Sequence, residues 1–172
     1  MIRGGLHVPR PSDRGFCMEK LITFAVPCYN SAAYMHHCVD TLLTAGEEAQ
    51  IVIVDDGSTK DNTAEIADEY AAKYPRIVEV VHKENGGHGS GVNTGIAHAK
   101  GLYFKVVDSD DWLNPKELSV LMERIRKDVA AGMQIDLYLA NFVYEKPSEN
   151  SRHPRRYKKN FPVEKQFGWK DI

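Results

Sequence analysis

The chain has 172 residues, of which 42% are hydrophobic and 27% charged, a composition typical of one ordinary soluble globular domain. Its formal net charge of −2 creates no global field that would attract nucleic acid, so we expect no nucleic-acid partner. No stretch approaches the roughly 18 apolar residues that span a bilayer, and the start of the chain lacks the apolar core of a signal peptide.

The N-terminal segment indicates where the folded domain begins, and the cysteines indicate the redox compartment of the protein. Residues 1–17 carry prolines and glycines with little periodic pattern, so we expect a disordered extension or an expression remnant, followed by a domain that begins near Met18. The chain has three cysteines, Cys17, Cys28 and Cys38. Because their number is odd and no pair has C-x-x-C spacing, we expect neither a disulfide framework nor a zinc knuckle. A reducing cytoplasm fits this pattern.

From Leu21 onward, short β-branched runs alternate with longer amphipathic stretches, which predicts an α/β domain around a mainly parallel sheet. We expect five strands, over residues 21–26, 51–55, 77–82, 102–107 and 135–140. Helices are expected to begin near Ser31, near Lys60, after the glycine-rich loop 85–91, and at Pro115. Asn114 suits the N-cap of the last helix, and Gly101 suits the C-terminal cap of the third.

The C-terminal part has a different character. Residues 141–146 and 155–160 flank a Pro-Ser-Glu-Asn turn and predict a β-hairpin. We therefore divide the chain into a ligand-binding domain over 18–140 and a segment over 141–172 that holds the hairpin and the start of a further, acceptor-side half. Residues 145–172 hold eight Lys/Arg against four Asp/Glu, which would allow peripheral contact with anionic lipid, although a solvated charged hairpin is the simpler interpretation. The apolar residues that end at Ile172 have nothing downstream to pack on, and this pattern predicts a truncation.

Polar motifs follow three of the expected strands: Pro27-Cys28-Tyr29-Asn30, Asp55-Asp56-Gly57-Ser58 and Asp108-Ser109-Asp110-Asp111. Because ligands of open parallel sheets bind beyond the carboxyl ends of the strands, we expect these motifs to share one edge. Crowded carboxylates repel one another, and a divalent cation relieves that repulsion. We therefore predict a Mg²⁺ or Mn²⁺ site with Asp108 and Asp110 as ligands, completed by substrate phosphates and water. The alternative is that both acidic motifs are simple turns.

The glycine-rich loop offers a second point of contact. Gly86 to Gly91 could bring backbone N–H groups to a pyrophosphate at the start of a helix, although the loop matches neither a P-loop nor a dinucleotide fingerprint. His88 could contact phosphate or be an ordinary surface histidine. Tyr29 could stack on a nucleobase or be a partly buried residue at a strand end.

Taken together, these motifs resemble those of glycosyltransferase family 2 enzymes with the GT-A fold, a Rossmann-like nucleotide-binding sandwich, over about residues 20–140. The matching pieces are Ala25-Val26-Pro27-Cys28-Tyr29-Asn30, Val54-Asp55-Asp56-Gly57-Ser58-Thr59 with Asp61-Asn62-Thr63, Asn93-Thr94-Gly95-Ile96-Ala97-His98-Ala99-Lys100-Gly101, and Asp108-Ser109-Asp110-Asp111-Trp112-Leu113. The resemblance implies a nucleotide-diphosphate-sugar donor, foremost a UDP-sugar, and an acceptor that is a saccharide or lipid-linked.

The resemblance also implies roles for individual residues. Pro27 and Tyr29 would lie near the base, Asp56 would accept the uracil ring N–H, and Asp111 is an alternative metal ligand to Asp108 and Asp110. The donor-binding set is Pro27, Tyr29, Asn30, Asp55, Asp56, Gly86, Gly87, Asp108 and Ser109.

By similarity, the reaction is an inverting displacement by an acceptor hydroxyl, and its general base is expected beyond Ile172. Val92 stands where many relatives carry arginine, so the phosphate or base contact of that arginine is not expected here. The resemblance is compatible with a location in the cytoplasm or at the cytoplasmic face of a membrane.

Three alternatives compete with a glycosyltransferase. A sugar-phosphate nucleotidyltransferase would begin its first loop with a glycine-rich basic cradle, where this chain has Pro27-Cys28-Tyr29-Asn30. A phosphatase with Asp108 as nucleophile would carry its motif after the first strand and would need threonine in place of Trp112. A nucleotide-sugar-binding module without activity is the third alternative.

Overall fold

The computed structural model describes residues 20–146, 151–157, 161, 167–168 and 170. The described residues belong to two compact units, one that ends at Arg126 and one that begins at Lys127. The helices and strands, in chain order, are β1 (Ile22–Cys28), α1 (Met35–Leu43), β2 (Ala49–Asp55), α2 (Thr63–Lys73), β3 (Val78–His82), α3 (His88–His98), β4 (Tyr103–Val106), α4 (Pro115–Ala130), β5 (Phe142–Lys146) and β6 (Ser151–Arg155).

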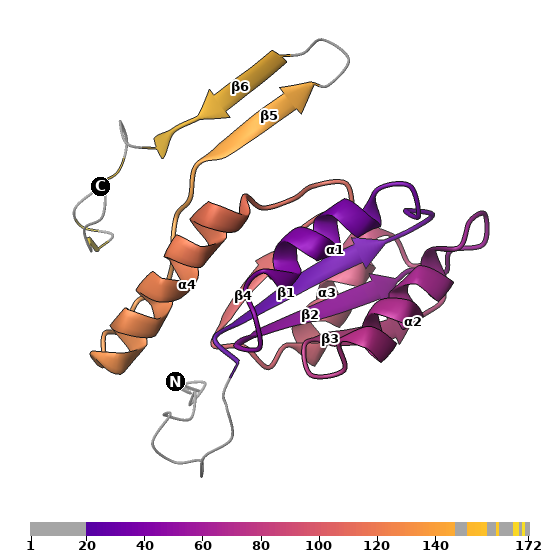
Figure 1. Cartoon of the computed structure of the whole chain (residues 1–172), viewed down its shortest axis with the longest axis horizontal. Helices are drawn as coiled ribbons and strands as arrows, with labels where there is room; N and C mark the ends of the chain where they lie inside the picture. The colour runs from indigo at the N-terminus through magenta and orange to yellow at the C-terminus, as the bar shows by residue number, and fades with distance from the viewer. Residues whose placement is uncertain (1–19, 147–150, 158–160, 162–166, 169, 171–172) are drawn as a thin grey trace, which may run out of the picture. The chain divides into compact units, whose positions relative to one another are not determined.

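A parallel sheet with the strand order β3-β2-β1-β4 forms the centre of the first unit (Figure 1). The chain runs outward from β1 to β3 and then returns to the opposite side of β1 as β4. β4 pairs only with the first half of β1, up to the pair Ala25↔Val106, whereas β2 pairs with β1 as far as Cys28↔Asp55. Because β2 and β4 lie on opposite sides of β1, the carboxyl ends of β1 and β4 form a topological switch point, which is where open α/β sheets bind ligands.

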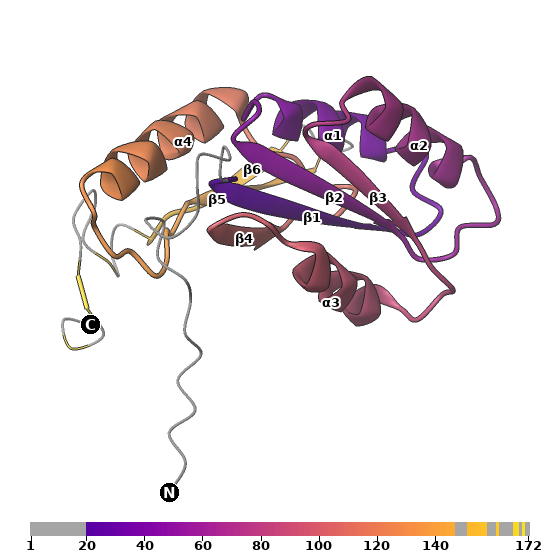
Figure 2. The ribbon, with the colours of Figure 1, turned by 90° about the horizontal axis from the view of Figure 1, so that it is seen from below.

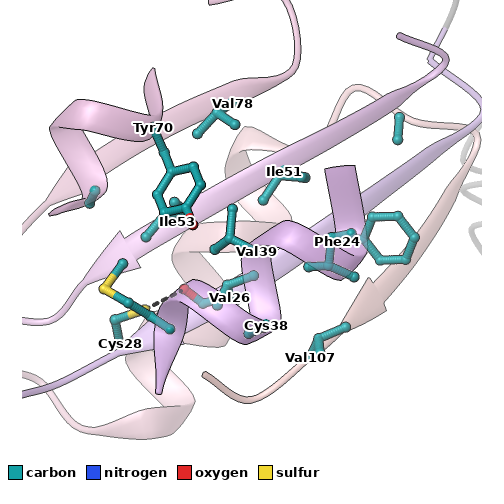
Figure 3. Packing of buried hydrophobic residues seen from close by; sticks show 14 of the residues in the cluster. Phe24, Val26, Cys28, Cys38, Val39, Ile51, Ile53, Tyr70, Val78 and Val107 are labelled. Carbon is teal, nitrogen blue, oxygen red and sulfur yellow. Dashed lines mark hydrogen bonds between the residues drawn. The ribbon is translucent and has the colours of Figure 1, made fainter. Parts of the chain in front are cut away.

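The hydrophobic core of this unit lies between the sheet and the helices α1 and α2 (Figure 3). Alternate residues of each strand point to this face, since side chains alternate along a strand. The buried members include Phe24, Val26 and Cys28 from β1, Ile51 and Ile53 from β2, Cys38 and Val39 from α1, and Tyr70 from α2. Leu118 and Met122 of α4 join the same cluster. Each large apolar side chain buried in this way stabilises the fold by about 1.5–3 kcal/mol.

The helix α3 covers the opposite face of the sheet (Figure 2), and glycines allow it to lie close to β1. A Cβ atom at Gly95 would lie 2.5 Å from the Cβ of Ala25, and one at Gly91 would lie 3.0 Å from the Cβ of Pro27. Because both distances are at or below the limit for real Cβ contacts, larger side chains at these positions would push α3 away from the sheet. The close approach brings the N-terminal end of α3 beside the loop after β1.

The first four predicted strands and the four predicted helices are confirmed, with small differences at their ends. The helix α1 begins at Met35 instead of Ser31, because the intervening residues form a turn in which the Tyr34 N–H donates to the Ser31 carbonyl. The N-cap role of Asn114 is confirmed: its Oδ1 accepts the N–H groups of Lys116 and Glu117 at 3.0 and 3.3 Å.

The predicted cap at Gly101 is wrong. The helix α3 ends at His98, and Ala99 already has extended backbone angles. Gly101 is required for another reason, because a Cβ atom there would overlap with the backbone of Ile22 and Thr23. Glycine at position 101 therefore allows two chain segments to approach closely, and it does not end a helix.

The predicted fifth strand over 135–140 is also wrong. Within the part of the chain that the structure describes, this segment joins neither sheet, and Leu137 and Leu139 are 59% and 46% exposed. An alternating apolar pattern becomes a strand only when a neighbouring strand completes its hydrogen-bond ladder.

The second unit contains an antiparallel hairpin in which β5 pairs with β6 from Phe142↔Arg155 to Lys146↔Ser151. Its first strand matches the prediction, but the second strand ends at Arg155, where the predicted strand began. The Pro-Ser-Glu-Asn turn lies outside the described residues. In neither unit does any described helix combine the length and apolar character that a membrane crossing requires.

Candidate functional site

A cleft of about 460 Å³ opens at the carboxyl ends of β1, β2 and β4, next to the start of α3. Among the residues predicted for the site, it is lined by Pro27, Tyr29, Asn30, Asp56, Gly87, Asp108, Ser109 and Asp110. Asp55 and Gly86 do not line it, although each bonds to its surroundings, and Asp111 lines a smaller neighbouring cleft. The three polar motifs therefore meet at one edge of the sheet.

The loop after β1 presents Tyr29 to the cleft and is held in place by Asn30. Tyr29 is 49% exposed. Asn30 has a φ of 50°, in the left-handed region that asparagine tolerates better than most residues. Its side-chain oxygen accepts the N–H groups of Thr59 and Lys60 at 3.1 and 3.0 Å, and its own N–H donates to Ser58 Oγ at 2.9 Å. Asn30 therefore ties the loop after β1 to the loop after β2.

A second chain of hydrogen bonds connects these loops to the loop after β4. Ser109 Oγ donates to Ser31 Oγ at 2.8 Å, the Ser31 N–H donates to Thr63 Oγ1 at 2.7 Å, and Thr63 Oγ1 donates to Asp61 Oδ1 at 2.6 Å. Sequence reasoning gave Ser31 no role in the site. Its only signal was its position directly after the Pro-Cys-Tyr-Asn motif.

Asp55 is buried and points into the protein instead of the cleft. Its Oδ1 accepts the N–H of Ser58 at 3.0 Å, and its Oδ2 lies 3.0 Å from His82 Nδ1. The other ring nitrogen of His82 lies 3.1 Å from Asp68 Oδ1. Hydrogen bonds to Asp55 and Asp68 raise the pKa of His82 above its usual value. Asp55 thus stabilises the turn that carries its neighbour Asp56.

Asp56 lines the cleft although its residue is only 3% exposed. Its carboxylate accepts hydrogen bonds from the Lys83 ammonium and from the N–H groups of Gly86 and Gly87, the latter two at 3.0 and 2.8 Å. Burial pushes the pKa of Asp56 up, but these donors outweigh it and hold the pKa below the usual value. The two glycine N–H groups are therefore directed at Asp56.

The turn at Gly57 is specific for glycine. Gly57 has a φ of +75°, and a Cβ atom there would lie 2.9 Å from the backbone nitrogen of Asn85. A larger residue would both strain the backbone and separate the loop after β2 from the glycine-rich loop. This contact keeps Asp56 within reach of its two glycine donors.

The acidic loop after β4 carries three carboxylates that repel one another. Burial raises the pKa of Asp111, and the charges of Asp110 and Asp108 raise it further. His88 Nε2 lies 2.8 Å from Asp108 Oδ1, a contact that the sequence did not predict. The carboxylate oxygens suit a hard divalent cation. In the described ranges no three His, Cys, Asp or Glu side chains surround a common point, so such a cation would need phosphate or water ligands as well.

The two described cysteines line the clefts, Cys28 the donor-side cleft and Cys38 the smaller neighbouring one. Cys28 and Cys38 are buried free thiols. Burial raises the pKa of both, and for Cys38 the charges of the acidic loop add to this effect and bring it to about 12. Both thiols therefore stay protonated at neutral pH.

Comparison with known proteins gives a consistent picture. The family described as "Glycosyl transferase family 2" matches residues 23–170. The uncharacterized glycosyltransferase EpsJ of Bacillus subtilis is 33% identical over 144 residues, which are 83% of this chain and 40% of EpsJ. Glycosyltransferase GlyG of Streptococcus pneumoniae is 38% identical over 120 residues, 67% of this chain and 39% of GlyG. The chain thus spans well under half the length of these relatives.

Solved structures share the fold. The crystal structure of Staphylococcus aureus TarS 1-349 in complex with UDP-GlcNAc matches with a TM-score of 0.55 and 29% sequence identity. The match covers 63% of this chain and 32% of that chain. The parallel sheet and its flanking helices are therefore of the GT-A type, as the sequence predicted.

Proposed function

The chain belongs to glycosyl transferase family 2, and on that premise we propose that it binds a nucleotide-diphosphate sugar, foremost a UDP-sugar, for transfer to a saccharide or lipid-linked acceptor. The observation that carries this proposal is the cleft of about 460 Å³, where an exposed tyrosine, a buried carboxylate and an acidic loop meet at the switch point of the sheet. Each of these features suits one part of such a donor.

The base is assigned to the side of the cleft formed by Pro27, Tyr29 and Asp56. An exposed aromatic ring accepts the face of a nucleobase. A carboxylate has about four acceptor positions, and the N–H of Gly86 is shared between both oxygens of Asp56, so the three donors from Lys83, Gly86 and Gly87 can be held with one position left for another donor. Asp56 can thus accept the uracil ring N–H while the glycine-rich loop holds it in place. In this proposal, Gly86 and Gly87 act through Asp56.

The diphosphate is assigned to the acidic loop. Asp108 and Asp110 would hold Mg²⁺ or Mn²⁺, with Asp111 as the alternative ligand, and Ser109 would help to position the loop through Ser31. The crowding of three carboxylates within four consecutive residues supports this assignment, because a cation would relieve the repulsion among them. A bound divalent cation would offset the negative charge that develops on the departing diphosphate.

The chemistry that we propose is an inverting displacement, in which an acceptor hydroxyl attacks the anomeric carbon and the nucleoside diphosphate departs. TarS, whose structure holds UDP-GlcNAc, supports a donor of this class. The position of the general base stays a prediction from the resemblance. The buried free thiols Cys28 and Cys38 support the proposal of a reducing, cytoplasmic location.

The remaining alternative is a module that binds the donor without transferring sugar. A thermal-shift screen of UDP-, GDP- and TDP-sugars with Mn²⁺ would identify the donor, and release of the nucleoside diphosphate would then be measured with and without acceptors. We expect UDP-sugars to raise the Tm most, and we expect acceptor-dependent UDP release. Binding without release under any acceptor would favour the module, and the absence of any shift would contradict the proposal.

A further inference from the structure

A second cleft of about 250 Å³ adjoins the donor cleft. Tyr34 and Asp110 line both clefts, so the two share a wall. The second cleft is otherwise formed by the start of α1 and by the residues that follow Asp110, chiefly His37, Asp111 and Trp112. The proposed donor interactions do not use these last three residues, apart from the alternative role of Asp111.

The walls of this cleft combine an aromatic surface with hydrogen-bonding groups. Trp112 is 40% exposed, an unusual position for so large an apolar side chain. The His37 ring packs against it with centroids 4.9 Å apart and planes tilted by 56°. Asp110 and Asp111 add exposed carboxylates on one side. The indole is thus held by a neighbouring ring while part of its surface is open to a ligand.

We propose that this second cleft is a subsite for one neutral pyranose ring of the acceptor, an inference that rests on the proposed transferase function. One face of a pyranose presents C–H groups, which can cover the indole and bury apolar surface. Its rim presents hydroxyl groups, which can donate to carboxylates. The negative charge of Asp111 disfavours an acidic sugar in the same place.

The size and position of the cleft agree with this assignment. Its volume lies below the roughly 300–1,000 Å³ of pockets for drug-sized ligands, so a single ring suits it better than a nucleotide. A transferase must hold its two substrates side by side before it can react them. Because Tyr34 and Asp110 line both clefts, an acceptor ring in the second cleft would lie next to the donor.

The test uses the indole N–H signals of the chain in ¹H–¹⁵N NMR spectra. The sequence has two tryptophans, Trp112 and Trp169, so a Trp169→Phe variant assigns the Trp112 signal. Methyl glycosides of glucose, galactose, N-acetylglucosamine and glucuronic acid are titrated with and without UDP and Mn²⁺. We expect at least one neutral glycoside to shift the Trp112 signal saturably, and the glucuronide to bind more weakly.

Variants separate this subsite from the donor site. Trp112→Ala and His37→Ala should weaken glycoside binding, measured by saturation-transfer NMR, by at least about tenfold, while UDP affinity changes less than about twofold. Val120→Ala, which shortens an exposed apolar residue of α4, serves as the control. Unchanged UDP affinity also shows that the variants fold.

Each remaining outcome decides the question. If UDP binds but no glycoside shifts the Trp112 signal saturably, the proposal of an acceptor subsite is wrong and the proposed function stands. If Trp112→Ala weakens UDP as much as the glycoside, the cleft belongs to the donor and the subsite is again wrong. If glycosides bind but UDP does not, the saccharide site stands and the proposed donor is wrong.

Discussion

His88 Nε2 lies 2.8 Å from Asp108 Oδ1, so the first residue of α3 contacts the first carboxylate of the loop after β4. This contact joins the N-terminus of α3 to the acidic loop at the cleft. A hydrogen bond of this kind would fix the orientation of Asp108 for the metal binding that we propose.

We expect His88→Ala to weaken Mn²⁺-dependent UDP binding by about tenfold, because loss of such an outer partner typically costs 10–100-fold in metal affinity. His88→Gln, which keeps a hydrogen-bonding group, should restore most of the loss. Calorimetry with UDP and Mn²⁺ measures both variants, and His153→Ala, at an exposed position of β6, is the control. An alanine variant that binds like the wild type would remove His88 from the site.

Asp56→Ala should weaken UDP binding more than binding of ribose 5-phosphate, which lacks the base. The reason is that Asp56 is assigned to the uracil ring N–H. Lys83→Met keeps the carboxylate but removes its main charged donor, so we expect a smaller loss of UDP affinity. Equal losses for both ligands in the Asp56 variant would leave Asp56 as an anchor of the glycine-rich loop only.

His82 should make stability depend on pH. Its pKa is raised in the folded state by Asp55 and Asp68, so its stabilising effect is complete below its unfolded pKa of about 6.5 and is lost as the pH rises through the folded pKa. The difference in Tm between wild type and His82→Gln should therefore narrow from about pH 6 to about pH 8.5. The side chain is 43% exposed, so the effect is small.

A gap in Tm that stays constant over this range would exclude the ion pairs of His82 as its cause. His153→Gln, measured in parallel at an exposed position, shows how much of any change comes from the buffer conditions alone.

Gly95→Ala should destabilise the fold by about 1–3 kcal/mol, because the added methyl group would overlap with the Cβ of Ala25. Gly89→Ala in the same helix is the matched control, since a Cβ atom there meets nothing within 4 Å. The control should be neutral or stabilising by up to about 1 kcal/mol through helix propensity. Urea unfolding measures both, and equal stabilities would contradict the close packing of α3 on β1.

The sheet and its edge could be predicted from the sequence because the buried strands β1 and β2 are nearly continuous apolar runs between polar loops. Such runs form a parallel sheet covered on both faces. The positions of the Asp56 and Asp108 motifs beyond the strand ends followed from that topology. The sequence pattern thus predicted where the loops lie on the sheet, but it did not predict which residues the loops contact.

The contacts within the site could not be predicted because they depend on tertiary distances. Nothing in the sequence indicates that Gly86 and Gly87 donate to Asp56, or that Asn30 bonds two residues of the next loop. Gly101 illustrates the same limit, since a glycine after a helix suggests a cap, whereas the structure uses it for a close approach to β1. Local sequence patterns do not indicate which segments of the chain come into contact in the fold.

The most direct test of the donor site is a calorimetric titration of UDP into the chain with Mn²⁺, with EDTA, and with the variant Asp110→Ala. Asp136→Ala, which removes an exposed carboxylate of the second unit, is the control. We predict saturable binding to the wild type and the control with Mn²⁺, weakened at least about tenfold, or ~1.4 kcal/mol, by EDTA or by Asp110→Ala. Equal UDP affinity under all these conditions would contradict a metal-dependent donor site at the acidic loop.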